Sequence, residues 1–277
     1  MSNLVSTQWL ATHLNDVRVV DASWYMPSEK RNPRAEFEAS HIPGSVFFDI
    51  DAISDKSSAL PHMLPSPDEF SQAVGALGIG NGDTVVVHDG SGMFSAARVW
   101  WMFRAMGHDN IKVLDGGFPK WTREGRAVAN GVANLTAKSF TSSLKPSLIR
   151  DFDAVMNVVK DKSAQIADAR SASRFTASEP EPRAGVRGGH MPGARNVHYR
   201  SLLNDDGSFK STDQLRDVIA RAGIDATRPV VTTCGTGVTA AIVMLALDEI
   251  GATDVALYDG SWTEWGSLPE APVVTGA

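Results

Sequence analysis

Residues 230–250 read VVTTCGTGVTAAIVMLALDEI and contain Cys234, the one cysteine of the 277-residue chain. The β-branched residues before Cys234 are typical of a short buried strand. The run from Ala240 to Ile250 is rich in Ala, Leu and Met and predicts a helix, which Gly251 ends in the usual C-cap position. The order of strand, thiol, glycine loop and helix predicts an α/β domain, in which reactive loops follow the carboxyl ends of strands.

The position of Cys234 also predicts chemistry. Backbone N–H groups converge in a glycine loop that opens a helix, and the helix dipole is positive there. Such a setting favours the thiolate, which is the nucleophilic form of cysteine. A lone cysteine is more often a small buried hydrophobe. We interpret Cys234 as a nucleophile because strand, glycine loop and helix occur together around it.

Composition limits the kind of partner and the compartment. Lys and Arg number 26 against 32 acidic residues, with no block of like charge, so neither nucleic acid nor an anionic membrane is expected as a partner. A single cysteine excludes an internal disulfide and a cysteine-based metal cluster and fits a reducing cytoplasm. We expect no cofactor, because the histidines lack the spacing of a zinc site and Gly90-Ser91-Gly92 is too short for a dinucleotide fingerprint. No apolar run approaches the ~20 residues of a membrane span, and the first residues lack a signal-peptide pattern. We therefore expect a cytoplasmic protein.

The chain also repeats itself once. Four landmarks recur in the same order: Asp21-Ala22 with Asp168-Ala169, His41-Ile42-Pro43-Gly44 with His190-Met191-Pro192-Gly193, Thr84 to Gly92 with Val230 to Gly237, and Val113 to Trp121 with Ala256 to Trp265. His-x-Pro-Gly indicates a tight turn that leads into a strand. In this alignment Asp89 stands where the second half has Cys234. The protein is thus predicted to be a duplicated domain.

The repeat predicts the domain organisation. We expect an N-terminal domain over residues 1–127, a linker over residues 128–146 that is rich in small polar residues, and a C-terminal domain over residues 147–277. Each half alternates short apolar strands with helical stretches, such as Pro67 to Leu77 and Thr212 to Ala222. This pattern predicts a mainly parallel sheet flanked by helices in each domain.

The whole chain resembles the two-domain sulfurtransferases of the rhodanese family. Both halves carry the family's Asp-Ala and His-x-Pro-Gly signatures, and only the second half keeps the loop cysteine. The resemblance implies two tandem rhodanese-like domains, of which the N-terminal one lacks the catalytic cysteine. Thiosulfate sulfurtransferases typically have Arg and Lys just after this cysteine, whereas the uncharged CGTGVTA of residues 234–240 resembles the loop of 3-mercaptopyruvate sulfurtransferases. It implies that the loop residues Gly235, Gly237, Val238 and Thr239 contact the substrate.

Two further segments resemble the 3-mercaptopyruvate branch. The stretch from Ser173 to Arg183 is similar to one in which two arginines bind the substrate carboxylate, and these correspond to Arg174 and Arg183. Without the resemblance, both would be read as arginines of a solvated loop.

A first-half segment is similar to one that supplies an Asp and a His to a proton relay with the loop hydroxyl. The implied residues are Asp51, His62 and Thr236, in a site between the two domains. Many members of the family have serine at the third position, so threonine is a departure that keeps the hydroxyl. From the residues alone, a surface histidine and a helix-capping aspartate are equally good readings of the first two.

The resemblance implies transfer of sulfur from 3-mercaptopyruvate, through a persulfide on Cys234, to a thiol, thioredoxin or cyanide. Two alternatives stay open at this point. The donor could be thiosulfate, or the chain could be a persulfide carrier or docking module that receives sulfur from another enzyme.

Overall fold

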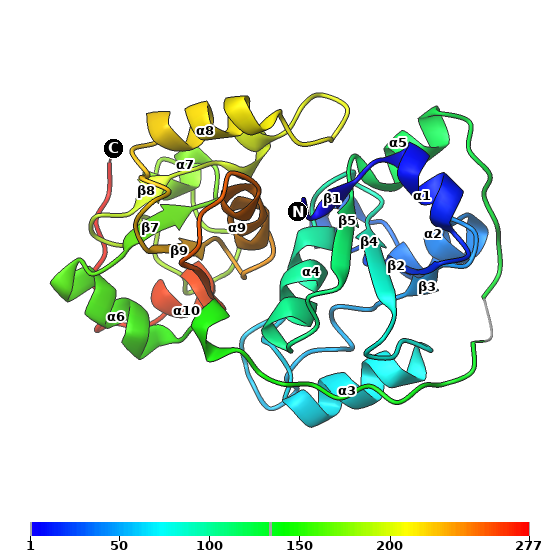
Figure 1. The fold of residues 1–277 in the computed structure, drawn as a ribbon. Helices are drawn as coiled ribbons and strands as arrows, with labels where there is room; N and C mark the ends of the chain where they lie inside the picture. Colours follow the sequence, from blue (N-terminus) through cyan, green and yellow to red (C-terminus); the bar gives the residue numbers. More distant parts are fainter. Residues whose placement is uncertain (1, 133–134, 277) are drawn as a thin grey trace. The chain divides into compact units, whose positions relative to one another are not determined.

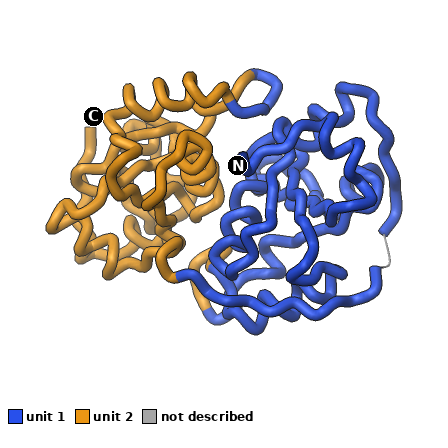
Figure 2. Tube along the Cα trace, in the orientation of Figure 1, with its two compact units in different colours: residues 1–57, 64–145, 205–209 blue, residues 58–63, 146–204, 210–277 orange. Residues whose placement is uncertain are grey.

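The computed structural model describes residues 2–132 and 135–276. It forms two compact units, shown in different colours in Figure 2. The N-terminal unit holds the chain up to residue 145, except for residues 58–63, and also includes residues 205–209. The C-terminal unit holds the rest, including residues 58–63. The predicted division treats each half as contiguous and stays a prediction; residues 133 and 134 of the predicted linker lie outside the described residues.

The N-terminal unit is built on a parallel five-stranded sheet in the order β1-β5-β4-β2-β3 (Figure 1). Its strands are β1 (Leu4–Val5), β2 (Val17–Asp21), β3 (Val46–Phe47), β4 (Thr84–His88) and β5 (Ile111–Leu114). Its helices are α1 (Thr7–His13), α2 (Pro33–Ala39), α3 (Pro67–Ala76), α4 (Ala96–Ala105) and α5 (Gly117–Arg123), with the short 3-10 helix η1 (Pro27–Glu29).

The C-terminal unit repeats this plan in the order β6-β10-β9-β7-β8. Each pair of neighbouring named strands is again parallel. Its strands are β6 (Ile149–Arg150), β7 (Gln165–Asp168), β8 (Arg195–Asn196), β9 (Val230–Thr233) and β10 (Val255–Tyr258). Its helices are α6 (Phe152–Asp161), α7 (Ala172–Phe175), α8 (Thr212–Arg221), α9 (Ala240–Glu249) and α10 (Ser261–Trp265), with the 3-10 helices η2 (Pro146–Leu148) and η3 (Tyr199–Leu202). The two strand orders match position by position, which confirms the predicted α/β fold and its duplication.

Local sequence signals explain where the helices begin. Ser66 and Ser211 each accept a hydrogen bond from the backbone of the first helical turn and complete a capping box, at the starts of α3 and α8. The two His-x-Pro-Gly segments form the predicted tight turns, with Gly44 and Gly193 in the left-handed region at φ 79° and 81°. Over the described ranges, no helix is both long and apolar enough to cross a membrane.

Each sheet is covered by helices on both faces, and apolar side chains fill the space between them. In the C-terminal unit, α6, α7 and α10 bring Val155, Phe175, Trp262 and Trp265 to one face of the sheet. Helix α9 is buried along most of its length because it packs against strands β9 and β10 and against helix α8. A helix that is apolar all round is typical of such a central position.

The predicted linker is not a free connection where the structure describes it. Phe140 is buried and packs edge-on against the rings of Phe70 and Phe103 in the N-terminal unit. Backbone hydrogen bonds also join Lys138 to Gly75 and Ser143 to Met106. Residues 135–145 therefore form part of the N-terminal unit, held by one aromatic side chain in an otherwise polar run. 

Candidate functional site

Cys234 lies directly after strand β9 and ahead of helix α9, with only 2% of its surface exposed. Strand β9 pairs with β10 on one side and with β7 on the other, so the thiol is at the carboxyl edge in the middle of the sheet. This is the position in which open parallel sheets place their reactive loops.

The corresponding loop of the N-terminal unit shows what its backbone can bind. The carboxylate of Asp89 is buried and accepts hydrogen bonds from four backbone N–H groups, those of Ser91, Phe94, Ser95 and Ala96, at 2.8–2.9 Å. These donors belong to the loop and to the first residues of α4. The loop is therefore a cradle for one buried negative charge.

The same backbone plan surrounds Cys234. Gly237 has φ 77° where the N-terminal unit has Gly92 at φ 96°, a left-handed conformation that glycine adopts without a Cβ clash. Cys234 takes the place of Asp89, whose carboxylate the loop amides bind in the N-terminal unit. Such amides stabilise a thiolate and equally a persulfide anion.

Helix α10 supports the loop from the opposite side. The N–H groups of Trp262 and Thr263 donate to the carbonyl oxygens of Cys234 and Gly235, both at 2.9 Å. The Ser261 hydroxyl accepts the Cys234 N–H at 3.2 Å. With its carbonyls held in this way, the loop keeps one backbone orientation.

An arginine lies over the loop. A Cβ placed on Gly235 would be 3.1 Å from Nη2 of Arg174, so the glycine makes room for this guanidinium. Arg174 Nη2 also donates to Oε2 of Glu181 at 2.5 Å. The Glu181 side chain is 4% exposed and its other oxygen accepts from Arg170 Nη1 at 2.8 Å. Glu181 thus bridges two guanidinium groups beside the cysteine loop.

Strand register brings this charged group to the loop. Asp168, the last residue of β7, pairs with Thr233 of β9, and its carboxylate binds Arg170 at 2.6 Å. Arg170 also lies over the ring of Trp262, with 4.2 Å from its guanidinium carbon to the ring centroid. Burial opposes the charge on Arg170, but the carboxylates of Asp168 and Glu181 outweigh it and raise the pKa of the guanidinium.

The other predicted site residues of the C-terminal unit have varied settings. Thr236 is 9% exposed and Val238 is 3% exposed, while Thr239 is half-buried at the N-cap position of α9, where its side chain makes no capping hydrogen bond. Arg183 is exposed in the turn after Glu181, and its side chain makes no hydrogen bond or ion pair with the residues that the structure describes. The structure thus places Arg174 against Gly235 of the loop, whereas Arg183 lies exposed in the turn after Glu181.

The two first-half residues belong to different units. His62 is in the segment 58–63 of the C-terminal unit, is 6% exposed, and holds a left-handed backbone at φ 63°. Asp51 is exposed in the N-terminal unit, where its carboxylate accepts the indole N–H of Trp24 at 3.0 Å. Its backbone carbonyl accepts from Lys56. Their joint role with Thr236 stays a prediction.

The sequence alone assigns no role to Arg170, Glu181 or Ser261. Glu181 lies in the stretch from Ser173 to Arg183, Arg170 directly follows an Asp-Ala signature, and Ser261 lies in a segment of the internal repeat. A signal for Glu181 existed, since an acid between two arginines in a proline-rich loop favours ion pairing. The contact of Ser261 with the Cys234 backbone depends on its backbone angle, which the sequence does not reveal.

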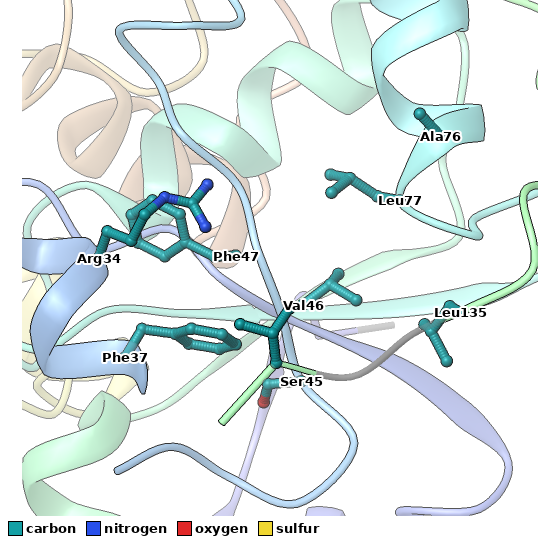
Figure 3. Close-up of a pocket in the computed structure, with 9 residues that line it drawn as sticks. Arg34, Phe37, Ser45, Val46, Phe47, Ala76, Leu77 and Leu135 are labelled. Atoms are coloured by element: carbon teal, nitrogen blue, oxygen red, sulfur yellow. The ribbon is translucent and has the colours of Figure 1, made fainter. Parts of the chain in front are cut away.

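A cavity of about 210 Å³ lies elsewhere, in the N-terminal unit (Figure 3). Its walls include Phe37, Val46 and Leu77, and the Arg34 guanidinium lies over the ring of Phe47. None of the predicted site residues lines it. The cavity is therefore no part of the predicted site in the loop after β9.

Comparisons with known proteins match both halves of the chain. The Rhodanese-like domain model matches twice, over residues 6–124 and 151–268. Human 3-mercaptopyruvate sulfurtransferase is 41% identical over 95% of this chain and 91% of its own length. An Arabidopsis thaliana protein named thiosulfate/3-mercaptopyruvate sulfurtransferase 1, mitochondrial, is 42% identical over 98% of this chain and 77% of its own. The solved structure of SseA from Escherichia coli, described as a 3-mercaptopyruvate sulfotransferase, is similar with a TM-score of 0.87 and 38% identity over 95% of this chain and 99% of that one.

Proposed function

The chain belongs to the rhodanese family, and on that premise we propose that it transfers sulfur from 3-mercaptopyruvate through a persulfide on Cys234. One observation carries the proposal. A buried thiol stands in an uncharged glycine loop at the carboxyl edge of the sheet, with the Arg174 guanidinium directly over Gly235. A thiolate and a fixed cation side by side suit a donor that has both a transferable sulfur and a carboxylate.

In the first half-reaction the Cys234 thiolate attacks the sulfur of 3-mercaptopyruvate. A sulfur–sulfur bond forms and the carbon–sulfur bond breaks, with its electron pair passing to the carbon. The organic product leaves as the enolate of pyruvate and takes up one proton. The loop amides stabilise the negative charge on the attacking thiolate and afterwards on the persulfide.

Substrate binding is the proposed role of the two arginines. Arg174 is held over the loop by Glu181, and Arg183 lies two residues after Glu181 on an exposed turn. A carboxylate accepts two parallel hydrogen bonds from a guanidinium, which fixes its orientation. The loop residues Gly235, Gly237, Val238 and Thr239 are proposed to contact the rest of the donor.

Proton transfer is the proposed role of Thr236 with His62 and Asp51. The burial of Thr236 in the loop and of His62 in the same unit supports this assignment.

In the second half-reaction an acceptor attacks the outer sulfur and regenerates Cys234. We propose a thiol acceptor such as thioredoxin, with cyanide as a substitute, and the cytoplasm as the compartment.

A second candidate donor is thiosulfate. The names of the relatives support it, because the Arabidopsis protein carries both activities in its name. The uncharged loop argues against it, since a dianion is bound best by cations adjacent to the thiol. A persulfide carrier without a small-molecule donor is the remaining alternative.

Substitution of the nucleophile tests the proposal. Cys234→Ser should abolish release of pyruvate from 3-mercaptopyruvate, because a serine hydroxyl cannot form the persulfide. Wild-type protein incubated with the donor alone should gain the mass of one sulfur atom on Cys234. Retained turnover in the serine variant would contradict the role of Cys234 as nucleophile. A wild-type protein that releases no pyruvate would favour the alternative of a persulfide carrier.

A further inference from the structure

Ser261, the first residue of α10, has an unusual backbone conformation. Its φ is 51°, in the left-handed region that side chains with a Cβ rarely adopt, and the residue is completely buried. Non-glycine residues there carry conformational strain, which persists only where surrounding contacts hold it. The strain therefore points to a contact made by the serine side chain.

That contact is with the nucleophile's own backbone. Ser261 Oγ accepts the Cys234 N–H at 3.2 Å and donates its own proton to the Tyr258 carbonyl at 2.8 Å. The hydroxyl thus joins the end of β10 to the end of β9. It satisfies a buried N–H that no strand partner reaches, because strand β9 ends at Thr233.

The N-terminal unit provides an internal comparison. Its matching residue is Gly117, with φ 56°, so the backbone turn is the same without a side chain. A Cβ on Gly117 would lie 2.7 Å from the carbonyl oxygens of Asp89 and Gly92, which leaves no room for serine. The next N–H, that of Phe118, still donates to the Asp89 carbonyl at 3.0 Å. Both units keep the backbone contact, but the hydroxyl contact exists only in the unit with the thiol.

Chemistry explains the difference. In the N-terminal unit the Asp89 carboxylate orders its own loop through four charge-assisted hydrogen bonds. A thiol or thiolate is a weaker acceptor than a carboxylate and cannot order the loop to the same degree. The loop around Cys234 consequently needs a hydrogen bond from a residue outside the loop, and the Ser261 hydroxyl lies in the position to supply it.

We propose that Ser261 is a positioning residue for sulfur transfer, whose hydroxyl fixes the Cys234 N–H and so aims the thiolate and the loop amides at the donor. The inference rests on the proposed function, because it concerns the same nucleophile. Ser261 acts through the Cys234 backbone alone and does not contact the reacting sulfur of the donor.

Two substitutions separate this role from a structural one. Ser261→Gly removes both the hydroxyl and the strain, as the N-terminal unit does naturally, while Ser261→Ala removes the hydroxyl and keeps the strain. Each should lower kcat for pyruvate release, and the single-turnover rate of persulfide formation, by about tenfold, the effect of one lost hydrogen bond to a buried N–H. KM for 3-mercaptopyruvate should change by less than about twofold because Arg174 is untouched. The glycine variant should melt at a higher temperature than the alanine variant.

Ser201→Ala is the matched control. The Ser201 hydroxyl donates to the carbonyl three residues earlier, that of His198 at 2.7 Å, as Ser261 does to Tyr258, but it lies in η3 and does not bind the cysteine loop. This variant should keep wild-type kcat. A folded Ser261→Gly protein with wild-type kcat and persulfide rate would overturn the inference while leaving the sulfurtransferase assignment intact. An inactive wild-type protein would refute the proposed function itself.

Discussion

At the scale of single residues, Glu181 controls the charge around the cysteine loop. Its buried carboxylate joins Arg170 to Arg174, and together with Asp168 it balances the two positive charges. Removal of one member of a buried ion pair leaves an uncompensated charge, which is strongly destabilising. The position of Arg174 over Gly235 therefore depends on Glu181.

Glu181→Gln should reduce the free energy of unfolding by about 1–3 kcal/mol, because the buried Arg170 keeps Asp168 as a partner but the partly exposed Arg174 loses its carboxylate. Urea denaturation measures this loss. The substitution should also raise KM for 3-mercaptopyruvate, since Arg174 is no longer held over the loop. An unchanged denaturation midpoint would show that the bridge contributes nothing to stability.

Arg174→Ala should lower kcat/KM by an amount equivalent to about 1.5–3 kcal/mol, the range for a hydrogen bond to a charged group. Arg183→Ala should have an effect in the same direction if the exposed guanidinium closes on the carboxylate. Arg216→Ala serves as a control, because Arg216 is an exposed arginine on α8 paired with Asp213. Unchanged kinetics in both test variants would mean that these arginines are ordinary surface residues.

At the scale of elements, the two strand–loop–helix segments differ mainly in what fills the cradle. Asp89 supplies the charge in the N-terminal unit, where four N–H groups surround its carboxylate. Asp89→Ala should cost about 3 kcal/mol or more of stability, since several buried donors lose their acceptor, while Asp89→Asn should cost less because an amide oxygen remains. Thermal unfolding of both variants gives the comparison. Equal melting temperatures for the two variants would argue against the cradle.

The elements themselves were largely predictable. The run from Ala240 to Ile250 predicts α9 to within one residue, because a long apolar segment with a following glycine is a strong helix signal. The role of Ser261 could not be predicted from the sequence, since its left-handed φ results from packing between β9 and β10. Phe140 was also missed, because one aromatic residue in a polar run has no periodicity.

At the scale of the whole molecule, the internal repeat predicts both sheets and the family. It does not predict that residues 58–63 and 205–209 each belong to the unit of the other half. Such exchanges depend on contacts between residues far apart in the sequence, and no local pattern encodes them. For His62 this grouping matters, because it places the histidine in the same compact unit as Cys234.

Three histidines make stability depend on pH, of which His88 and His108 are buried and His198 is half-buried. Burial lowers the pKa of His88, His108 and His198 below the usual 6.5, and for His88 this outweighs the opposing effect of Asp21 and Asp89. Each of these side chains therefore takes up its proton at a lower pH in the folded protein than in the unfolded chain, where protonation begins below about pH 6.5. Stability should therefore fall as the pH drops through this range.

Urea midpoints at about pH 7.5 and about pH 5.5 check this sign. The midpoint should be lower at the acidic value, and His88→Thr, which introduces the residue found at the matching position Thr233, should reduce the difference. A midpoint that rises on acidification would contradict the neutral state of these histidines.

The most direct test of the central claim is kcat/KM of the wild-type protein for 3-mercaptopyruvate and for thiosulfate, measured with the same acceptor. The loop after Cys234 has no cation of its own, and Arg174 beside it is already paired with Glu181. We predict a value at least about tenfold higher for 3-mercaptopyruvate, because Arg174 beside the thiol matches a single carboxylate, whereas a thiosulfate dianion would need a second positive charge that the loop does not supply. A kcat/KM for thiosulfate equal to or above that for 3-mercaptopyruvate would contradict the account.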